Sequence, residues 1–297
     1  MSDNEENKYA INAKGVSFRY QEGTLALNDV TFHARHGEFV ALLASNGSGK
    51  TTLLKALAGL IKPQYGKILI DGDDINSMSS KELYSKTGIV IQNPDDQLFG
   101  ATVREDVAFG PRNMDLSEDE VETRVKEALE GVGAGRLGKR AIQHLSFGEK
   151  KKVAVAGVLA MRPNILILDE PTAGLDPAGE ASMMRLLSRL NRECRVTVIL
   201  ATHSVDMLPL FADRIFVLSE GRVLKSGPAA DIFTDHEMIE QAKLRLPYIS
   251  SLLHEMKRLD GVPINGLPLT IGEARKRMLE LIPEDILIKQ LDKKSHE

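Results

Sequence analysis

The chain has 297 residues, which is enough for one large domain with an appendage or for two modest domains. Its net charge of -4 comes without a basic stripe and argues against a dedicated nucleic-acid-binding protein, so no nucleic-acid partner is expected. Cys194 is the only cysteine, so an intrachain disulfide is impossible and a reducing compartment is indicated.

The sequence carries no signal for secretion or membrane insertion that we can identify. Residues 1–8 are polar and acidic, lack the apolar region of a signal peptide and are predicted to be disordered. The apolar runs are far shorter than the ~20 residues that a membrane-spanning helix needs. We therefore expect a soluble chain that takes part in membrane processes only through a partner.

The first part of the chain is predicted to contain several strands and one prominent helix. Strand-forming residues flanked by turns indicate strands at 16–20, 30–32, 39–43, 67–70 and 88–92. A helix is expected over 51–60, because Gly59 and Pro63 can close it.

From about residue 93 to residue 160 the pattern favours helices. Ser117 can cap a helix whose first turn is acidic. Val121, Val125 and Leu129 then recur at helical spacing, so their side chains are expected to face a core.

After Pro163 the alternation of strands and helices returns. Residues 165–168 and 196–201 are short, continuously apolar runs, as in parallel strands that are buried on both faces. A hairpin is predicted over 214–225, and the tail beyond it is rich in helix formers, most clearly at 248–259 and 271–282.

A glycine-rich turn follows the strand at 39–43 and opens the helix after it, which is the context in which a P-loop pattern is informative. Backbone N–H groups in such a turn suit phosphate oxygens, Lys50 can reach the β- and γ-phosphates, and the Thr51 hydroxyl can bind Mg²⁺. On this motif alone, an incidental turn is the alternative. The candidate nucleotide-binding residues are Ser45, Asn46, Gly47, Ser48, Gly49, Lys50, Thr51 and Thr52.

Ala44 stands where the pattern G-x-x-x-x-G-K-[ST] has its first glycine. An alanine is tolerable there if the backbone does not need a positive φ. We expect weaker or altered nucleotide binding from this departure, but not its loss.

Two acids, Asp169 and Glu170, follow the apolar run at 165–168. Asp169 can hold Mg²⁺ through water, and Glu170 can orient or deprotonate an attacking water. The alternative is an acidic turn after a core strand, and a kinase or GTPase could share both motifs.

The segment at 145–149 is predicted to begin a helix whose free backbone N–H groups suit an anion. Ser146 is a good N-cap, and Gly148 permits close approach of another backbone. Lys150, Lys151 and Lys152 follow at once and oppose the helix dipole, which favours a nearby polyphosphate or acidic partner.

At this segment the chain resembles the ATP-binding cassette (ABC) ATPases, whose signature is close to L-S-G-G-Q. Here it is Leu-Ser-Phe-Gly-Glu, so Phe147 and Glu149 depart from the pattern. The other family motifs appear in the right order along the chain, and the resemblance covers about 9–230. They are Tyr20 for the aromatic that stacks on adenine, Gln92 for the Q-loop, Asp176 for the D-loop and His203 for the switch histidine.

The resemblance implies an α/β fold, with a P-loop ABC ATPase core, an antiparallel β subdomain and a helical subdomain over about 93–160. Residues 9–230 would form the nucleotide-binding domain, and 231–297 a small helical C-terminal extension for dimerisation or regulation. The implied cofactors are ATP and Mg²⁺. In this family two cassettes face each other head to tail, and a homodimer is the simplest case.

The resemblance also assigns roles to residues. Catalysis would use Glu170, His203 and Gln92, and Mg²⁺ would be held by Thr51, Gln92 and Asp169. The partner chain would supply the signature and D-loop residues, which are Ser146, Phe147, Gly148, Glu149 and Asp176.

Residues 92–99, 102–111 and 146–157 resemble the ATPase subunits of energy-coupling factor importers, and 244–247 resembles the cobalt/nickel branch. The expected partners are integral membrane components for transmembrane passage and substrate binding, with the chain peripheral at the cytoplasmic face. Leu98 and Phe99 either contact such a partner or fill the helical subdomain. A vitamin importer and a non-transport ABC ATPase are the alternative functions.

Overall fold

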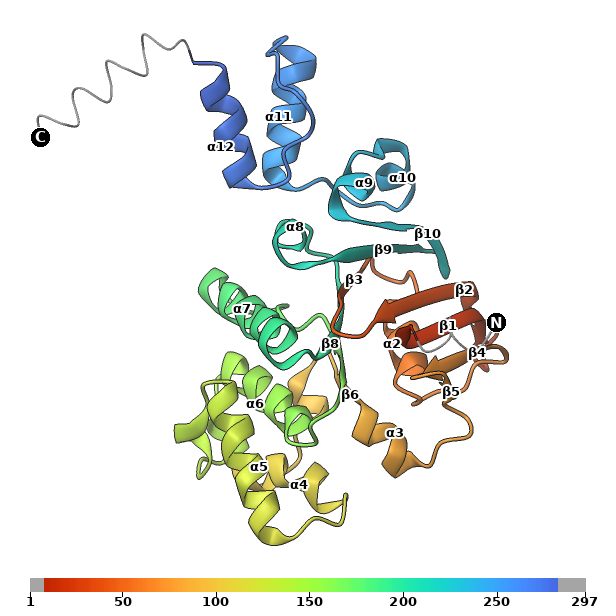
Figure 1. Ribbon diagram of the computed structural model, residues 1–297, viewed down its shortest axis with the longest axis vertical. Coiled ribbons are helices and arrows are strands. Elements are labelled where there is room, and N and C mark those ends of the chain that lie inside the picture. Colours follow the sequence, from red (N-terminus) through yellow and green to blue (C-terminus); the bar gives the residue numbers. More distant parts are fainter. Residues whose placement is uncertain (1–7, 283–297) are drawn as a thin grey trace, which may run out of the picture.

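A six-stranded sheet with the order β10-β9-β3-β8-β7-β6 organises the part of the chain that this computed structural model describes, residues 8–282 (Figure 1). All neighbours are parallel except the β9–β10 hairpin, which confirms the predicted hairpin. Every residue of β3, β7 and β8 is buried, which explains their continuously apolar sequence. The strands are β3 (Phe39–Ala44), β6 (Thr87–Val90), β7 (Ile165–Asp169), β8 (Thr197–Thr202), β9 (Arg214–Ser219) and β10 (Arg222–Gly227).

A second, antiparallel sheet has the order β2-β1-β4-β5 and confirms the expected β subdomain. Its strands are β1 (Tyr9–Arg19), β2 (Leu25–Arg35), β4 (Tyr65–Ile70) and β5 (Asp73–Asp74). β1 and β2 are longer than predicted, because their buried positions include small or polar residues such as Ala10, Asn12 and Ala34, which carry little strand signal.

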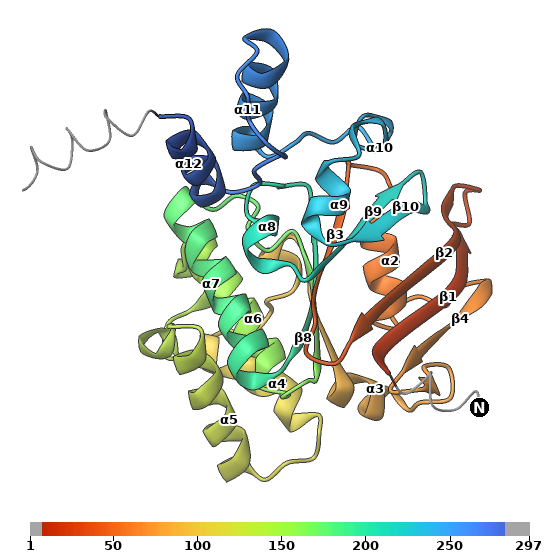
Figure 2. The ribbon, with the colours of Figure 1, turned by 45° about the horizontal axis from the view of Figure 1, so that its top comes forward.

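Helix α2 (Lys50–Leu57) lies between the two sheets, as Figure 2 shows, and one apolar core joins all three elements. The predicted helix is confirmed but ends earlier than expected. Gly59 adopts a φ of 70° just beyond its end, and its N–H donates to the carbonyl of Ala56. A left-handed glycine of this kind is a common helix stop. Helix α3 (Ser80–Lys86) then leads into β6.

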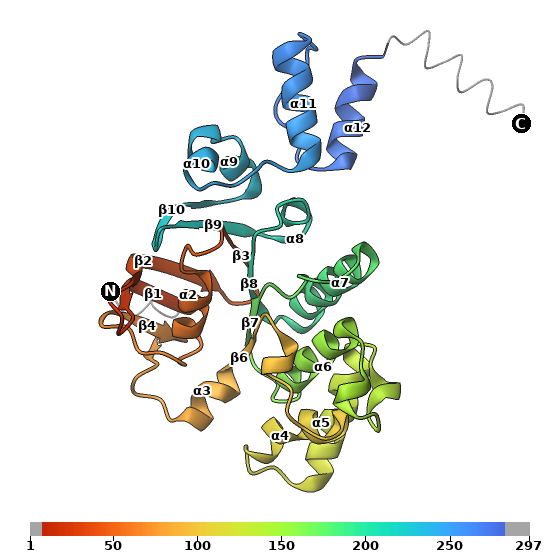
Figure 3. The same ribbon diagram turned by 180° about the vertical axis from the view of Figure 1, so that it is seen from behind.

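The helical subdomain follows β6 and lies at the opposite end from the antiparallel sheet (Figure 3). Ser117 caps α5, and Val121, Val125 and Leu129 are buried, so both predictions are confirmed. The elements are the 3₁₀ turns η1 (Pro94–Asp96), η2 (Gly135–Leu137) and η3 (Ile142–His144) and the helices α4 (Val103–Arg112), α5 (Glu118–Gly131) and α6 (Phe147–Leu159).

Helix α7 (Pro177–Cys194) was not predicted, although it is the longest helix among the described residues. It covers, with α6, the face of the large sheet that α2 leaves free (Figure 2). Its start carries two ordinary signals, since Asp176 accepts a hydrogen bond from Gly179 and Pro177 occupies the first turn. The short helix α8 (Leu208–Phe211) completes this layer.

The chain beyond β10 forms two units that pack differently. Helices α9 (Ala229–Phe233) and α10 (His236–Gln241) bury Phe233 and Ile239 in the core of the large sheet. Helices α11 (Tyr248–Leu259) and α12 (Ile271–Glu280) share a separate small core and project from the rest of the molecule (Figure 1). The predictions for residues 1–7 and 283–297 lie outside the described residues.

The projecting helices are attached to the loop that follows β8. Arg245 pairs with Asp206, the backbone N–H of Tyr248 donates to the same carboxylate at 2.8 Å, and the guanidinium lies 3.9 Å from the centre of the Tyr248 ring. Burial raises the pKa of the Asp206 carboxyl, but the hydrogen bonds from Arg245 and Tyr248 outweigh it and leave that pKa lowered. The start of α11 is therefore tied to a segment close to His203.

Candidate active site

The strands β3, β6, β7 and β8 are parallel, so their carboxyl ends meet at one edge of the sheet, where ligands bind in folds of this kind. The predicted phosphate loop, Gln92, the acid pair and His203 follow these strands in turn. They surround a cavity of about 490 Å³. The predicted residues that line it are Asn46, Gly47, Gly49, Lys50, Thr51, Thr52, Gln92, Asp169, Glu170 and His203.

The phosphate loop depends on glycine at one position in particular. Gly49 has a φ of 99°, and a Cβ there would lie 2.4 Å from the carbonyl oxygen of Ala26. Gly47 is also left-handed, with a φ of 76°. Only glycine combines that conformation with such a close approach, so the loop cannot accept a side chain at position 49.

Ala44 is the last residue of β3 and does not have a positive φ, so the structural condition for an alanine at this position is met. Its carbonyl oxygen accepts a hydrogen bond from Lys50 Nζ at 2.9 Å. The strength of nucleotide binding with Ala44 stays a prediction.

The turn between β9 and β10 also lines the cavity, and sequence reasoning treated it only as a hairpin. The Gly221 N–H donates to the carbonyl of Ser48 at 3.0 Å, and a Cβ on Gly221 would lie 2.7 Å from the carbonyl of Ala26. Glu220 and the residues 24–26 contribute to the same wall. The only local signal was a glycine in a turn, which many hairpins share.

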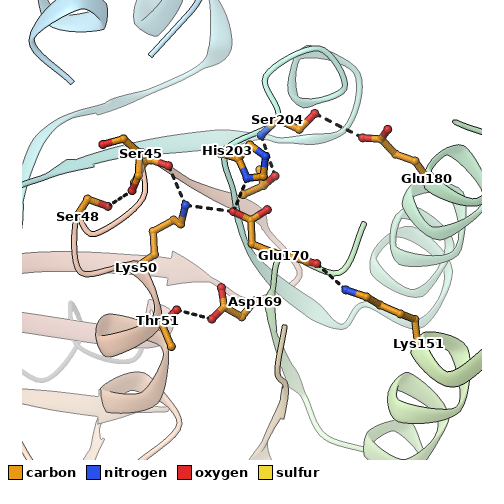
Figure 4. Close-up of polar contacts among 12 residues, drawn as sticks. Ser45, Ser48, Lys50, Thr51, Lys151, Asp169, Glu170, Glu180, His203 and Ser204 are labelled. Atoms are coloured by element: carbon orange, nitrogen blue, oxygen red, sulfur yellow. Dashed lines mark hydrogen bonds and ion pairs between the residues drawn. The ribbon is translucent and has the colours of Figure 1, made fainter. Parts of the chain in front are cut away.

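The Glu170 carboxylate lies between the side chains of Lys50 and His203 and contacts both (Figure 4). Its Oε1 is 3.1 Å from Lys50 Nζ and 2.8 Å from His203 Nδ1. Lys50 and Glu170 are buried, whereas the His203 side chain is exposed. Glu170 also has a φ of 47°, a conformation that is uncommon for a residue other than glycine and that often accompanies function.

Asp169 meets the requirements of a Mg²⁺ ligand. Its Oδ2 accepts a hydrogen bond from Thr51 Oγ1 at 2.6 Å, while its buried Oδ1 has no partner among the described residues. Burial raises the pKa of this carboxyl, and the Thr51 hydrogen bond opposes the rise. Gln92 lines a hollow of about 210 Å³ together with Thr51 and Asp169. These three oxygen-bearing side chains therefore suit a hard cation.

Tyr20 lies beside the phosphate loop but is not among the described residues that line the cavity. Its hydroxyl hydrogen-bonds with Thr52 Oγ1 at 2.9 Å, and its ring meets Phe18 edge to face at 5.0 Å. Ser45 also does not line the cavity. Its carbonyl oxygen accepts a hydrogen bond from the Ser48 hydroxyl. The stacking role of Tyr20 stays a prediction.

None of the residues expected to act from a partner chain lines this cavity in the part of the chain that the structure describes. Ser146 begins α6 with a capping box in which Glu149 accepts the Ser146 N–H at 2.8 Å. That hydrogen bond lowers the pKa of the Glu149 carboxyl, so the departure from glutamine places an anion at the helix start. Ser146 and Asp176 are exposed, as a role toward another chain requires.

Phe147, the other departure from the signature, packs on the D-loop of its own chain. A Cβ on Gly174 would lie 2.8 Å from the Phe147 ring, and Gly174 has a φ of 78°. A Cβ on Gly148 would lie 3.5 Å from the Leu175 side chain. The phenylalanine is therefore accommodated by a glycine in the facing loop.

The lysines after the signature have internal partners, contrary to what their position suggested. Lys150 pairs with Asp95. Lys151 is buried and donates to the backbone carbonyls of Gln92 and Glu170. A polyphosphate or acidic partner is therefore not needed to explain these two lysines, and sequence reasoning missed the contact of Lys151 with the site.

The described residues contain no group of three or more His, Cys, Asp or Glu side chains placed to hold a metal ion. No helix in residues 8–282 is long and apolar enough to cross a membrane.

The chain matches the family described as ABC transporter over residues 27–173. A putative ABC transporter ATP-binding protein of Geobacter sulfurreducens is 51% identical over 275 residues, which cover 93% of this chain and 98% of that protein. The energy-coupling factor transporter ATP-binding protein EcfA of Methanocaldococcus jannaschii is 44% identical over 278 residues, with coverage of 93% and 99%.

Two solved structures share the fold. The structure of cbiO1 from Clostridium perfringens, described as part of the ABC transporter complex cbiONQ, matches with a TM-score of 0.72 at 43% identity and covers 83% of this chain and 99% of that one. A dimeric ATP-binding cassette in a post-hydrolysis state, bound to ADP and Pi, matches with a TM-score of 0.67 at 30% identity, with coverage of 74% and 98%.

Replacing Asp169 by asparagine should stabilise the chain in the absence of nucleotide and Mg²⁺. Because the pKa of Asp169 is raised on folding, the wild type loses stability as the pH rises above the ordinary carboxyl pKa of 3.8. The advantage of Asp169→Asn in unfolding free energy should therefore grow as the pH rises above 3.8 and level off once the folded carboxyl is ionised, measured by urea denaturation across that range. Hydrolysis should fall by about 100-fold or more.

Mg²⁺ with ATP provides the control for this variant. It should raise the melting temperature of the wild type more than that of Asp169→Asn. Equal shifts in the two proteins, or wild-type turnover in the variant, would contradict the assignment of Asp169.

Proposed function

The chain belongs to the ABC transporter family and is an ATPase of that family, and from that premise we propose that it powers an importer of the energy-coupling factor type. The observation that carries the catalytic part is the single carboxylate oxygen of Glu170 that contacts both Lys50 and His203 beside the phosphate loop. The identity to EcfA over nearly the whole of both chains supports the transport part.

Hydrolysis requires the Lys50 ammonium to leave Glu170 for the phosphates. A triphosphate in the loop competes for that ammonium, because its charge is larger and the loop N–H groups hold it in place. Glu170 is then free to accept a proton from a water, and His203 helps to orient that attacking water. Mg²⁺, held by Thr51, Asp169 and Gln92, would neutralise charge on the phosphates.

We propose that the active form is a homodimer with shared sites. Ser146, Gly148 and Asp176 lie outside their own cavity, so they can complete the cavity of a second copy. The capping box keeps the Ser146 side chain in place as an acceptor of the Glu149 N–H, which leaves its hydroxyl hydrogen available for an incoming phosphate. The cassette solved as a dimer with ADP and Pi supports this arrangement.

Mixing two inactive variants should restore activity if the sites are shared. Lys50→Ala removes the phosphate ligand, and Ser146→Arg blocks the site of the partner, so each homodimer should be inactive. A mixed dimer keeps one site in which both Lys50 and Ser146 are intact. Steady-state ATPase activity of a 1:1 mixture should recover to roughly a quarter of the wild-type level for a symmetric two-site dimer.

The matched control is Lys50→Ala mixed with the double variant Lys50→Ala/Ser146→Arg, which cannot form an intact site. Absence of recovery in the first mixture, with mixed dimers demonstrated by tag pull-down, would contradict the shared sites, and wild-type activity of Ser146→Arg alone would show that each chain hydrolyses ATP by itself.

We also propose that the projecting helices contribute to the dimer. They expose Leu252, Leu259 and Ile271, with exposed fractions of 53%, 65% and 77%. Isolated apolar side chains are common on protein surfaces, but several on one small unit suggest an interface. Leu269, by contrast, packs into the cassette core, so removing the whole extension would damage the cassette itself.

The double variant Leu259→Lys/Ile271→Lys should lower the dimer fraction without nucleotide, because it places charges in the proposed contact. Sedimentation velocity at micromolar concentration measures that fraction. Leu210→Lys, at another exposed leucine, should leave it unchanged. An unchanged dimer fraction in the double variant would remove the extension from the interface.

We propose that the membrane partner docks in an apolar groove of about 530 Å³ between the large sheet and the helical subdomain. Phe99 is 66% exposed at this groove and meets Phe109 edge to face at 4.7 Å. Leu98, in contrast, is 8% exposed and belongs to the core, so it fills the subdomain. Of the two residues singled out from the sequence, only Phe99 can contact a partner.

We propose that the cargo is cobalt or nickel ions. The resemblance of residues 244–247 to that branch of the energy-coupling factor ATPases supports this choice. The likeness to cbiO1 adds support, because that protein is part of a transporter complex and is 43% identical. The membrane subunits would bind the ion, so this chain needs no ligand set for it.

Phe99→Asp should leave the ATPase activity of the isolated chain unchanged but reduce transport by at least about tenfold, because a charge in an apolar contact is costly. Uptake of Co²⁺ or Ni²⁺ into vesicles that contain the chain and its membrane partners measures the effect. Tyr65→Asp, at a 74% exposed aromatic on β4, is the control. Vesicles that take up a vitamin but neither ion would overturn the cargo, and wild-type uptake by Phe99→Asp would overturn the docking site.

A further inference from the structure

Lys151 is a buried lysine that reaches the active site from outside it. It lies near the start of α6 and is 1% exposed. Its ammonium donates to the carbonyl of Glu170 at 2.8 Å and to that of Gln92 at 2.9 Å (Figure 4 shows the first contact). Two segments of the site are thus joined by one side chain from the helical subdomain.

Burying this ammonium is costly, which makes its placement informative. Loss of solvent lowers the pKa of Lys151, and the charges of Glu170 and Asp169 oppose that effect. A buried cation is retained only where hydrogen bonds replace its water. Besides the two carbonyls, the Phe147 ring lies 5.4 Å from the ammonium and offers a weak cation–π contact.

The backbone of Glu170 needs such support. Its φ of 47° is unfavourable for a glutamate and persists only if surrounding contacts hold it. The Glu170 N–H donates to the Ala201 carbonyl at 2.9 Å, and the Glu170 carbonyl accepts from Ala173 at 3.1 Å and from Lys151. Lys151 is the contact in this set that comes from the helical subdomain.

Gln92 is held by the same ammonium. It follows β6, lines the cavity with an exposed side chain and leads into the 3₁₀ turn η1. A shift of the Lys151 side chain would therefore move the catalytic carboxylate and the Gln92 segment together.

We propose that Lys151 is a positioning residue for ATP hydrolysis, which fixes the backbone of Glu170 and of Gln92 by hydrogen bonds to their carbonyl oxygens. This role rests on the proposed function of Glu170 as the base. Turnover then depends on the position of α6, because Lys151 and the signature residue Ser146 both belong to the start of that helix. Each signature helix is then coupled to the hydrolytic carboxylate of its own chain.

The test is Lys151→Met in the full-length chain, which keeps the approximate side-chain volume and removes all donors. A misplaced catalytic group lowers the rate without affecting nucleotide contacts, so kcat should fall by on the order of 100-fold. No Lys151 atom lines the nucleotide cavity, so the KM for ATP and the Kd for ATP by calorimetry should stay within about twofold.

Lys152→Met is the matched control, because Lys152 is the next lysine on α6 and lines a different hollow with Ser182 and Arg185. It should keep wild-type kcat. An unchanged kcat in Lys151→Met would overturn the positioning role. A parallel loss of kcat and ATP affinity with a lower melting temperature would also overturn it, since that pattern indicates a purely structural residue.

If Lys151→Met does not fold at the assay temperature, Lys151→Leu, which likewise removes every donor, decides the question by the same criteria. Glu170→Gln tests the premise separately. Wild-type turnover in Glu170→Gln would remove the base assignment whatever the lysine variants do. An inactive Glu170→Gln beside a fully active Lys151→Met would reject only the role of Lys151.

Discussion

The contact of one Glu170 oxygen with both Lys50 and His203 is the interaction on which the site depends. Lys50 follows β3, Glu170 follows β7 and His203 follows β8, which lies between them in the sheet. The three side chains meet because parallel strands deliver their carboxyl ends to one edge. In the proposed mechanism, the oxygen that accepts the proton is held by the same cation that a triphosphate would attract. Nucleotide binding and release of the base would then be a single event.

The walls of the cavity join the two sheets. The Ala26 carbonyl, on β2 of the antiparallel sheet, lies against both Gly49 in the phosphate loop and Gly221 in the β9–β10 turn. A side chain at either glycine would push these segments apart by more than packed structures tolerate. The position of the antiparallel sheet therefore constrains the shape of the phosphate loop.

Two charged contacts connect the cavity edge of the sheet to parts of the chain that are proposed to face other molecules. Lys151 joins Glu170 and Gln92 to α6, whose first residues are proposed to complete the site of a second copy. Arg245 and Tyr248 join the loop after His203 to the projecting helices through Asp206. The Lys151 contact is buried and resists screening, whereas the Asp206–Arg245 pair is partly exposed and contributes less.

Most elements, the phosphate loop and the acid pair could be predicted from the sequence because their signals are local, whereas Gln92, Asp176 and His203 were assigned only by resemblance to a family. Apolar runs mark β3, β7 and β8, and the glycine turn before Lys50 marks the phosphate loop. Helix α7 was missed, although its cap at Asp176 is also local, because that residue was assigned only by resemblance. The tertiary structure alone decided the burial of residues that no periodic or apolar pattern marks. Lys151 turns inward to carbonyls 59 and 19 positions away, and Leu98 is core while Phe99 is exposed. Such outcomes depend on contacts between distant segments, so no pattern within one segment contains them.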